Sequence, residues 1–143
     1  MAAEREDAAG EADRPARFLH VQTTTDSRAE AMELAHDAVQ ARLAACAQVA
    51  GPVASTFWWE DGIERAEEWL LMLKLPADKY SELADFLLER HSYDEPEILA
   101  TPFVAGSPSF LGWMTEETRP RDAGAAGPPG PPPRDAEAPG PAR

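Results

Sequence analysis

At 143 residues, the chain has the length of a single domain. It contains 26 acidic and 13 basic side chains, a formal net charge of −13, which argues against nucleic acid and anionic membranes as partners. Cys46 is its single cysteine, so an internal disulfide is excluded and a reducing compartment is favoured. The sequence shows no basic-then-apolar signal peptide and no apolar run of about 20 residues, so we expect a cytoplasmic protein.

Both ends of the chain are predicted to be disordered. Residues 1–16 are rich in alanine and charge, and residues 120–143 hold eight prolines and four glycines without any Leu, Ile, Val or aromatic residue. Neither segment can bury enough apolar surface to offset the entropy of an ordered chain. We therefore expect one folded domain over residues 17–119.

The folded part is predicted to begin with a strand and a helix. Residues 18–23 alternate well enough for a strand, and Ser27 stands three residues before Glu30, the spacing of a capping box at a helix start. The helix is expected to end near Ala44. Its inner face is predicted from apolar side chains at steps of three and four residues, namely Met32, Ala35, Val39 and Leu43, with Leu34 and Ala38 beside them.

A long hairpin follows, with predicted arms over residues 49–60 and 63–75. Asp61 and Gly62 stand between these arms, and Asp-Gly is a strong signal for a two-residue type I′ turn. With this turn, Trp59 would lie opposite Glu64, Phe57 opposite Ala66 and Val53 opposite Leu70. Pro52 cannot donate to a strand ladder, so it predicts an edge strand or a bulge.

The hairpin is aromatic on both faces near its tip. Phe57 and Trp59 share one face and Trp58 takes the other, because successive strand residues alternate. A small domain cannot cover both faces of such long arms with its own helices. The sequence therefore predicts that another copy of the chain packs there, and interface packing is the favoured role of these rings.

The last third of the domain completes the pattern. Residues 70–73 are apolar on both faces and predict a central strand, and a second helix is expected from Pro76 to about His91. A fourth strand is predicted over residues 97–103, and Ser107-Pro108 opens a short third helix. The order predicts an α+β fold of the ferredoxin-like β-α-β-β-α-β type, with two helices on one face of an antiparallel sheet.

A set of motifs in this order resembles the CutA divalent-cation tolerance proteins. They are Leu43-Ala44-Ala45-Cys46, Ser55-x-Phe57-x-Trp59, the apolar arm ending at Lys74, His91-x-Tyr93-x-x-Pro96-Glu97-Ile98 and Phe110-Leu111-x-Trp113. The resemblance covers about residues 18–118 and implies a ferredoxin-like homotrimer in which the long hairpins of neighbours join. It implies a role in tolerance of, or response to, copper and other divalent metal ions, and a trimer similar to that of PII-type signalling proteins. Gln22 stands where some bacterial members have a cysteine proposed as a copper ligand.

Two groups of candidate site residues follow. Cys46, His91 and Glu97 are candidate metal ligands, because thiolate and imidazole favour copper and zinc. The candidate ligand cleft comprises Lys74, Tyr93, Trp59 and Glu64, with the Trp59 tip contributed by a neighbouring copy. Structural alternatives remain open: Cys46 as an inert buried thiol, and His91 as a helix terminus favoured by the helix dipole.

Three functional hypotheses remain. The first is a homotrimer that binds copper, another divalent cation or a metal-linked ligand in divalent-cation tolerance. The second is a PII-like trimeric signalling module that binds a small anionic ligand at the subunit clefts, and the third is a structural trimer that docks on another protein through residues 120–143. The sequence holds no phosphate loop, nucleophile elbow or paired-histidine metal motif, so we do not expect an enzyme.

Overall fold

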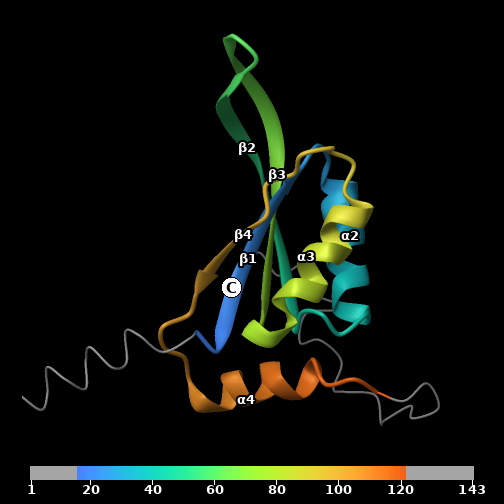
Figure 1. Ribbon diagram of the computed structural model, residues 1–143, viewed down its shortest axis with the longest axis vertical. Coiled ribbons are helices and arrows are strands. Elements are labelled where there is room, and N and C mark those ends of the chain that lie inside the picture. Colours follow the sequence, from blue (N-terminus) through green and yellow to red (C-terminus); the bar gives the residue numbers. More distant parts are fainter. Residues whose placement is uncertain (1–15, 122–143) are drawn as a thin grey trace, which may run out of the picture.

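The computed structural model describes residues 16–121 (Figure 1). The tails predicted to be disordered, residues 1–16 and 120–143, lie almost entirely outside the described residues. The described elements are β1 (Phe18–Thr25), α2 (Arg28–Gln40), β2 (Cys46–Trp59), β3 (Gly62–Pro76), the 3₁₀ turn η1 (Ala77–Lys79), α3 (Tyr80–Arg90), β4 (Leu99–Pro102) and α4 (Pro108–Glu117).

The predicted element order is confirmed. The four strands form one antiparallel sheet in the order β2-β3-β1-β4. Helices α2 and α3 lie side by side on one face of this sheet, and α4 lies across the end where β1 begins (Figure 1). No helix among the described residues is long and apolar enough to cross a membrane.

The core lies between the sheet and the α2–α3 layer. Leucines of β3, α3 and α2 fill it together with alanines of α2, namely Leu71, Leu73, Leu75, Leu83, Leu87, Leu34, Ala31, Ala35 and Ala38. The predicted inner face of α2 was therefore partly wrong, because Met32 and Val39 are 45% and 38% exposed. Ala35 and the flanking Leu34 and Ala38 are buried as predicted, whereas the buried Ala31 was not predicted. This alanine stripe, formed by Ala31, Ala35 and Ala38, lets the helix backbone approach a sheet surface already filled by leucines.

The start of α2 follows the prediction and its end does not. The Ser27 Oγ accepts a 3.1 Å hydrogen bond from the Glu30 amide, as the capping box requires. The helix ends at Gln40 rather than near Ala44 because Arg42 takes a left-handed φ of 63°. The amide of Leu43 then donates to the Ala38 carbonyl at 3.0 Å, the long bond of a Schellman motif.

Two later boundaries also differ from expectation. Strand β4 covers only Leu99–Pro102, although residues 97–103 were predicted, because β1 pairs with it only from Leu19 to Gln22. Helix α4 begins at Pro108 as predicted, yet the Ser107 side chain makes no capping hydrogen bond. The Ser107 carbonyl instead accepts the first bond of the helix from Leu111, at 3.0 Å.

The hairpin forms, but its turn lies one residue earlier than predicted. Trp59 pairs with Gly62 rather than Glu64, and Val53 pairs with Glu68 rather than Leu70. The turn residues are Glu60 and Asp61, with Glu60 at a φ of 54°. The pairing of the long arms outweighs the local Asp-Gly preference. Between Val53 and the turn the register shifts by two residues, so Phe57 and Trp59 still share one face and Trp58 lies on the other, as predicted.

The predicted irregularity at Pro52 is confirmed. The β2–β3 register shifts between Ala50 and Val53, and β2 is the edge strand of the sheet. Gly51 has a φ of 154°, and a Cβ there would lie 2.9 Å from Cε3 of Trp69. The backbone of β2 thus approaches the Trp69 ring where only glycine fits.

Beyond this bulge the hairpin leaves the rest of the domain. Strand β1 ends opposite Trp69, so within residues 16–121 β3 has no strand neighbour on that side from Glu68 to the turn. The two-stranded ribbon therefore projects past the helices (Figure 1). Four of its large apolar side chains are exposed, namely Trp58 at 72%, Ile63 at 61%, Trp59 at 55% and Phe57 at 37%.

Candidate functional site

The principal cleft lies where the hairpin leaves the sheet. Its volume is about 740 Å³, within the ordinary range for a small-molecule pocket. One wall is the hairpin face that carries Phe57, Trp59, Glu64 and Glu68, and the other is the segment after α3. The remaining lining residues are Thr24, Ser55, Thr56, Ala66, Tyr93, Asp94, Glu95 and Glu97.

A hydrogen bond closes the inner end of this cleft. The Tyr93 hydroxyl donates to Oε2 of Glu68 at 3.0 Å. Glu68 is only 9% exposed because Tyr93 occupies the space beside β3 beyond the end of β1. Burial raises the pKa of the Tyr93 hydroxyl above its usual range, as do the hydrogen bond and charge of Glu68 and the nearby charges of Asp26 and Glu30.

His91 holds the segment that carries Tyr93. Its side chain is fully buried, and its Nδ1 accepts a 3.0 Å hydrogen bond from the Tyr93 amide. Its Nε2 therefore carries the proton and donates to the Thr24 carbonyl at 2.8 Å. Both ring nitrogens are occupied by bonds to the protein, so the geometry gives His91 a positioning role.

Glu30 fixes the next residue of the same segment. Its two carboxylate oxygens accept hydrogen bonds from the amide and the hydroxyl of Ser92, at 3.0 and 2.7 Å. Side-chain hydrogen bonds thus join the first turn of α2 and the end of α3 to the wall of the cleft; His91 is buried, Glu30 and Tyr93 are partly buried and Ser92 is exposed. Such a connected polar network favours a fixed shape for the cleft.

The cleft is acidic and aromatic. Its lining includes five carboxylates, from Glu64, Glu68, Asp94, Glu95 and Glu97, and three aromatic rings, from Phe57, Trp59 and Tyr93. No lysine, arginine or histidine lines it among the described residues. The arrangement therefore favours a positively charged ligand over an anion.

The structure brings together only part of the predicted ligand cleft. Trp59, Glu64 and Tyr93 line one cleft within a single chain, whereas Lys74 lies further along β3, opposite both Cys46 and His20. Its ammonium lies 5.9 Å from the centroid of the Phe110 ring, near α4. A strand rises about 3.3 Å per residue, so six residues separate Lys74 from Glu68 by roughly 20 Å.

The predicted metal ligands are dispersed within one chain. Cys46 is the first residue of β2 and lies opposite Lys74 of β3. The His91 side chain is buried. Glu97 accepts a 3.2 Å hydrogen bond from Nε2 of Gln22. Across residues 16–121, no group of three or more His, Cys, Asp or Glu side chains is close enough to hold a metal ion. The described part of a single chain therefore does not assemble a fitting metal centre.

Sequence reasoning missed the buried acid of the cleft. Glu68 was not singled out, although it lies four residues from Glu64 on the same side of β3. Its role depends on Tyr93, which is 25 residues distant in the chain. The alternation of side chains along β3 could have indicated that Glu68 shares a face with Glu64. Its burial could not be predicted, because Tyr93 reaches Glu68 only where β1 ends, and that is a feature of the tertiary fold.

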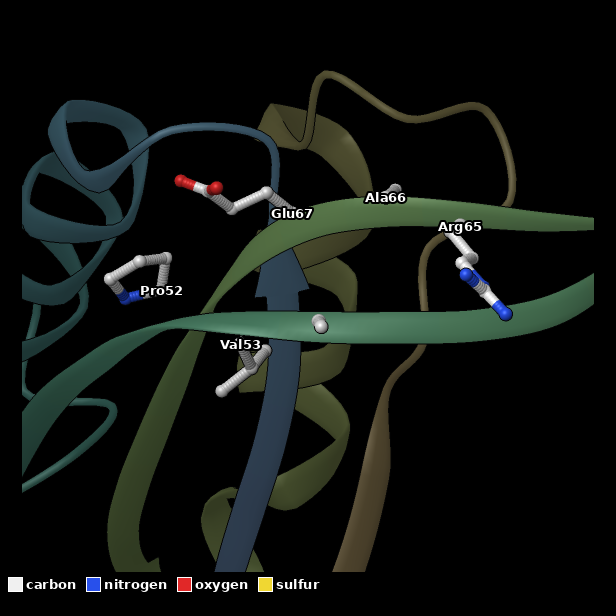
Figure 2. Close-up of a pocket in the computed structure, with 6 residues that line it drawn as sticks. Pro52, Val53, Arg65, Ala66 and Glu67 are labelled. Carbon is white, nitrogen blue, oxygen red and sulfur yellow. The ribbon is translucent and has the colours of Figure 1, made fainter.

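A second, smaller hollow lies on the hairpin beside the bulge. It measures about 310 Å³ and is lined by Pro52, Val53, Ala54, Arg65, Ala66 and Glu67. Figure 2 shows the Arg65 guanidinium beside the hairpin, further along it than Pro52 and Glu67. It holds no aromatic ring and one side chain of each charge, so it offers fewer convergent groups than the principal cleft.

Comparison with known families agrees with this architecture. Residues 19–117 match the family model described as CutA1 divalent ion tolerance protein, which is most of the chain. The chain belongs to this family. The matched segment begins in β1 and ends with α4, so it includes both walls of the cleft.

Individual CutA relatives show the same extent of similarity. The chain is 36% identical over 99 residues to the divalent-cation tolerance protein CutA of Archaeoglobus fulgidus, covering 69% of this chain and 94% of the relative. It is 32% identical over 99 residues to the chloroplastic protein CutA of Arabidopsis thaliana, covering 69% of this chain and 54% of that longer protein. The similarity to the plant protein is therefore confined to about half of its length.

Solved CutA structures share the fold. The periplasmic divalent cation tolerance protein CutA of Archaeoglobus fulgidus superposes with a TM-score of 0.69 at 34% identity, over 71% of this chain and 99% of that one. CutA1 of Oryza sativa superposes with a TM-score of 0.71 at 28% identity, over 73% of this chain and 95% of that one. The descriptions of these CutA proteins name a periplasmic and a chloroplastic location, so the cytoplasmic location stays a prediction for this chain.

Proposed function

We propose that this CutA-family chain acts in divalent-cation tolerance as a homotrimer that binds copper, another divalent cation or a metal-linked ligand. The observation that carries the proposal is the family match over residues 19–117. The acidic cleft supports it, because five carboxylates and no basic side chain line that surface in the described chain. The proposed role is one of binding, in the cytoplasm, and no reaction is assigned to it.

The exposed hairpin supports the assembly. Trp58 and Ile63 are directly opposite one another in the β2–β3 ladder, and each is more than 60% exposed. Aromatic and aliphatic side chains of this size are characteristic of the buried centre of protein interfaces. A neighbouring copy that packs on this ribbon would also bring its own side chains close to the cleft.

In this proposal the metal is bound with help from a second copy. The dispersed positions of Cys46, His91 and Glu97 argue against a site within one chain. Copper binds most tightly of the divalent first-row ions to nitrogen, oxygen and sulfur ligands, so it is the first ion to test. Glu97 borders the cleft and is available to such a shared site, whereas both nitrogens of His91 are engaged.

Native mass spectrometry of the full chain with and without copper(II) tests the proposal. We expect a trimer that takes up one copper per chain. Glu97→Gln and Cys46→Ser should reduce that uptake if these residues are ligands, whereas His36→Ala, on the exposed side of α2, should not. A monomer would contradict the assembly, and a trimer that stays free of metal would contradict the metal-binding part.

One observation favours the PII-like alternative. Lys74 lies opposite His20 in the β1–β3 ladder. It alternates with Leu73 and Leu75 of the core, so it lies on the sheet face away from α2 and α3. An anionic ligand could be held there, at the opposite end of the sheet from the acidic cleft. Lys74→Met should then abolish binding of a small anion and leave copper uptake unchanged, whereas loss of copper uptake would link Lys74 to the metal instead.

A further inference from the structure

We propose that the cleft at the base of the hairpin binds an aliphatic polyamine, a flexible organic molecule with several ammonium groups. This inference goes beyond metal tolerance, because it assigns the cleft a different class of ligand. It rests on a buried carboxylate without a cation, on aromatic rings beside it, and on the spacing of the remaining acids.

The first observation is the state of Glu68. Glu68 is 9% exposed as a residue, and no basic side chain of the described residues lies within 4.0 Å of its carboxylate. Its Oε2 accepts the hydrogen bond of Tyr93, while its Oε1 has no hydrogen-bond partner among the described residues. A buried charge costs much free energy unless a partner of opposite charge is present, so this oxygen points to a cationic ligand in the cleft.

The second observation is the aromatic wall. Phe57 and Trp59 share the hairpin face with Glu64 and Glu68, and Tyr93 stands across from them. The face of an aromatic ring attracts an ammonium group and also packs against methylene groups. A metal ion would gain little from three such rings, whereas an aliphatic chain between two ammonium groups would contact them throughout its length.

The third observation is the spacing of the acids. Glu64 and Glu68 lie on β3, and Asp94, Glu95 and Glu97 lie on the opposite wall. No three of these acids are close enough together to hold a metal ion. A linear polyamine places its charges apart along a chain, so separate carboxylates on the two walls can each bind one ammonium group.

The size and fixed shape of the cleft agree with such a ligand. A volume of about 740 Å³ accommodates a molecule much larger than a hydrated ion. Tyr93, His91 and Glu30 hold the wall after α3 in place before any ligand binds. A preformed cleft lowers the ordering cost of binding, which helps to offset the entropy lost by a flexible polyamine.

Titration calorimetry of the full chain with spermidine, after removal of metals on a chelating resin, tests the inference. We expect saturable binding of about one spermidine per chain, much weaker binding of butylamine with its single ammonium group, and a loss of affinity as salt is raised. Glu68→Gln keeps an acceptor for the Tyr93 hydroxyl but removes the buried charge, and should weaken spermidine binding by about tenfold or more.

Two further variants make the result decisive. Glu64→Gln changes an exposed acid of the same cleft and should weaken binding severalfold even if Glu68→Gln disturbs the fold. Glu89→Gln removes the same charge from the exposed surface of α3, outside the cleft, and should leave binding unchanged. Absence of saturable binding to the wild-type assembly would overturn the proposal, as would equal weakening by all three variants or equal affinity for butylamine.

Discussion

The Tyr93 hydroxyl donates a 3.0 Å hydrogen bond to the carboxylate of Glu68, and this contact joins the segment after α3 to the base of the hairpin. Glu68 is only 9% exposed, and burial raises the pKa of Tyr93, as do the hydrogen bond and the charge of Glu68. The same contact therefore shapes the acidic cleft and makes the unfolding free energy of the domain depend on pH in the alkaline range.

Tyr93→Phe should remove part of that alkaline dependence. Because the folded state raises the pKa of Tyr93, the hydroxyl stabilises the fold below the unfolded value of 10.0, and this contribution is lost as pH rises above it. At neutral pH the variant should lose about 1 kcal/mol of unfolding free energy, the usual value of a hydrogen bond. Urea unfolding should show that the difference in unfolding free energy between wild type and variant becomes smaller above pH 10.

Tyr80→Phe is the matched control, because it changes the other tyrosine of the chain, on α3. Each variant is compared with wild type at every pH, so the titration of lysines common to all three proteins cancels. A difference between wild type and Tyr93→Phe that does not change with pH would contradict the link between this hydroxyl and stability.

His91→Ala should destabilise the domain and release the wall of the cleft. The substitution leaves the Thr24 carbonyl and the Tyr93 amide without partners and empties a fully buried site. A cost of about 2–4 kcal/mol is expected from the cavity and the unpaired groups. Hydrogen exchange should show faster exchange at the Tyr93 amide than in the wild type.

His36→Ala is the control for that prediction. Its side chain is 73% exposed on α2, so the change should alter the unfolding free energy by less than about 0.5 kcal/mol. Equal destabilisation by the two histidine variants would contradict the positioning role assigned to His91.

Gly51→Ala should destabilise the bulge of β2. The new Cβ would meet Cε3 of Trp69 at 2.9 Å, and alanine rarely adopts the φ of 154° found there. We expect a loss of about 1–3 kcal/mol in chemical unfolding. Gly62→Ala is the comparison, because nothing lies within 4 Å of a Cβ at Gly62, and it should cost much less.

The sequence predicted the fold where local signals and the tertiary structure agree. The capping box of Ser27 and Glu30 marks the start of α2, and the proline after Gly51 marks the bulge of β2. In both places the backbone chemistry of a few neighbouring residues decides the local structure, so no knowledge of distant contacts is needed.

Prediction was wrong where a distant contact decides between local alternatives. The pairing of the long arms outweighed the Asp61-Gly62 turn signal. On α2, Met32 and Val39 are exposed, and alanines pack against the leucines of β3 instead. The cleft was predicted only in part for the same reason. Glu68 becomes a buried acid only because Tyr93, far away in sequence, packs beside it.

Trp58→Lys should dissociate the proposed trimer. Trp58 is 72% exposed on the projecting ribbon, and a lysine there would place an ammonium group in the apolar surface where another copy is proposed to pack. Size-exclusion chromatography with light scattering should show a shift from trimer towards monomer. Val104→Lys, at a position 94% exposed after β4, adds the same charge outside the hairpin and should keep the wild-type mass. A trimer that survives Trp58→Lys would show that this face of the hairpin does not hold the copies together.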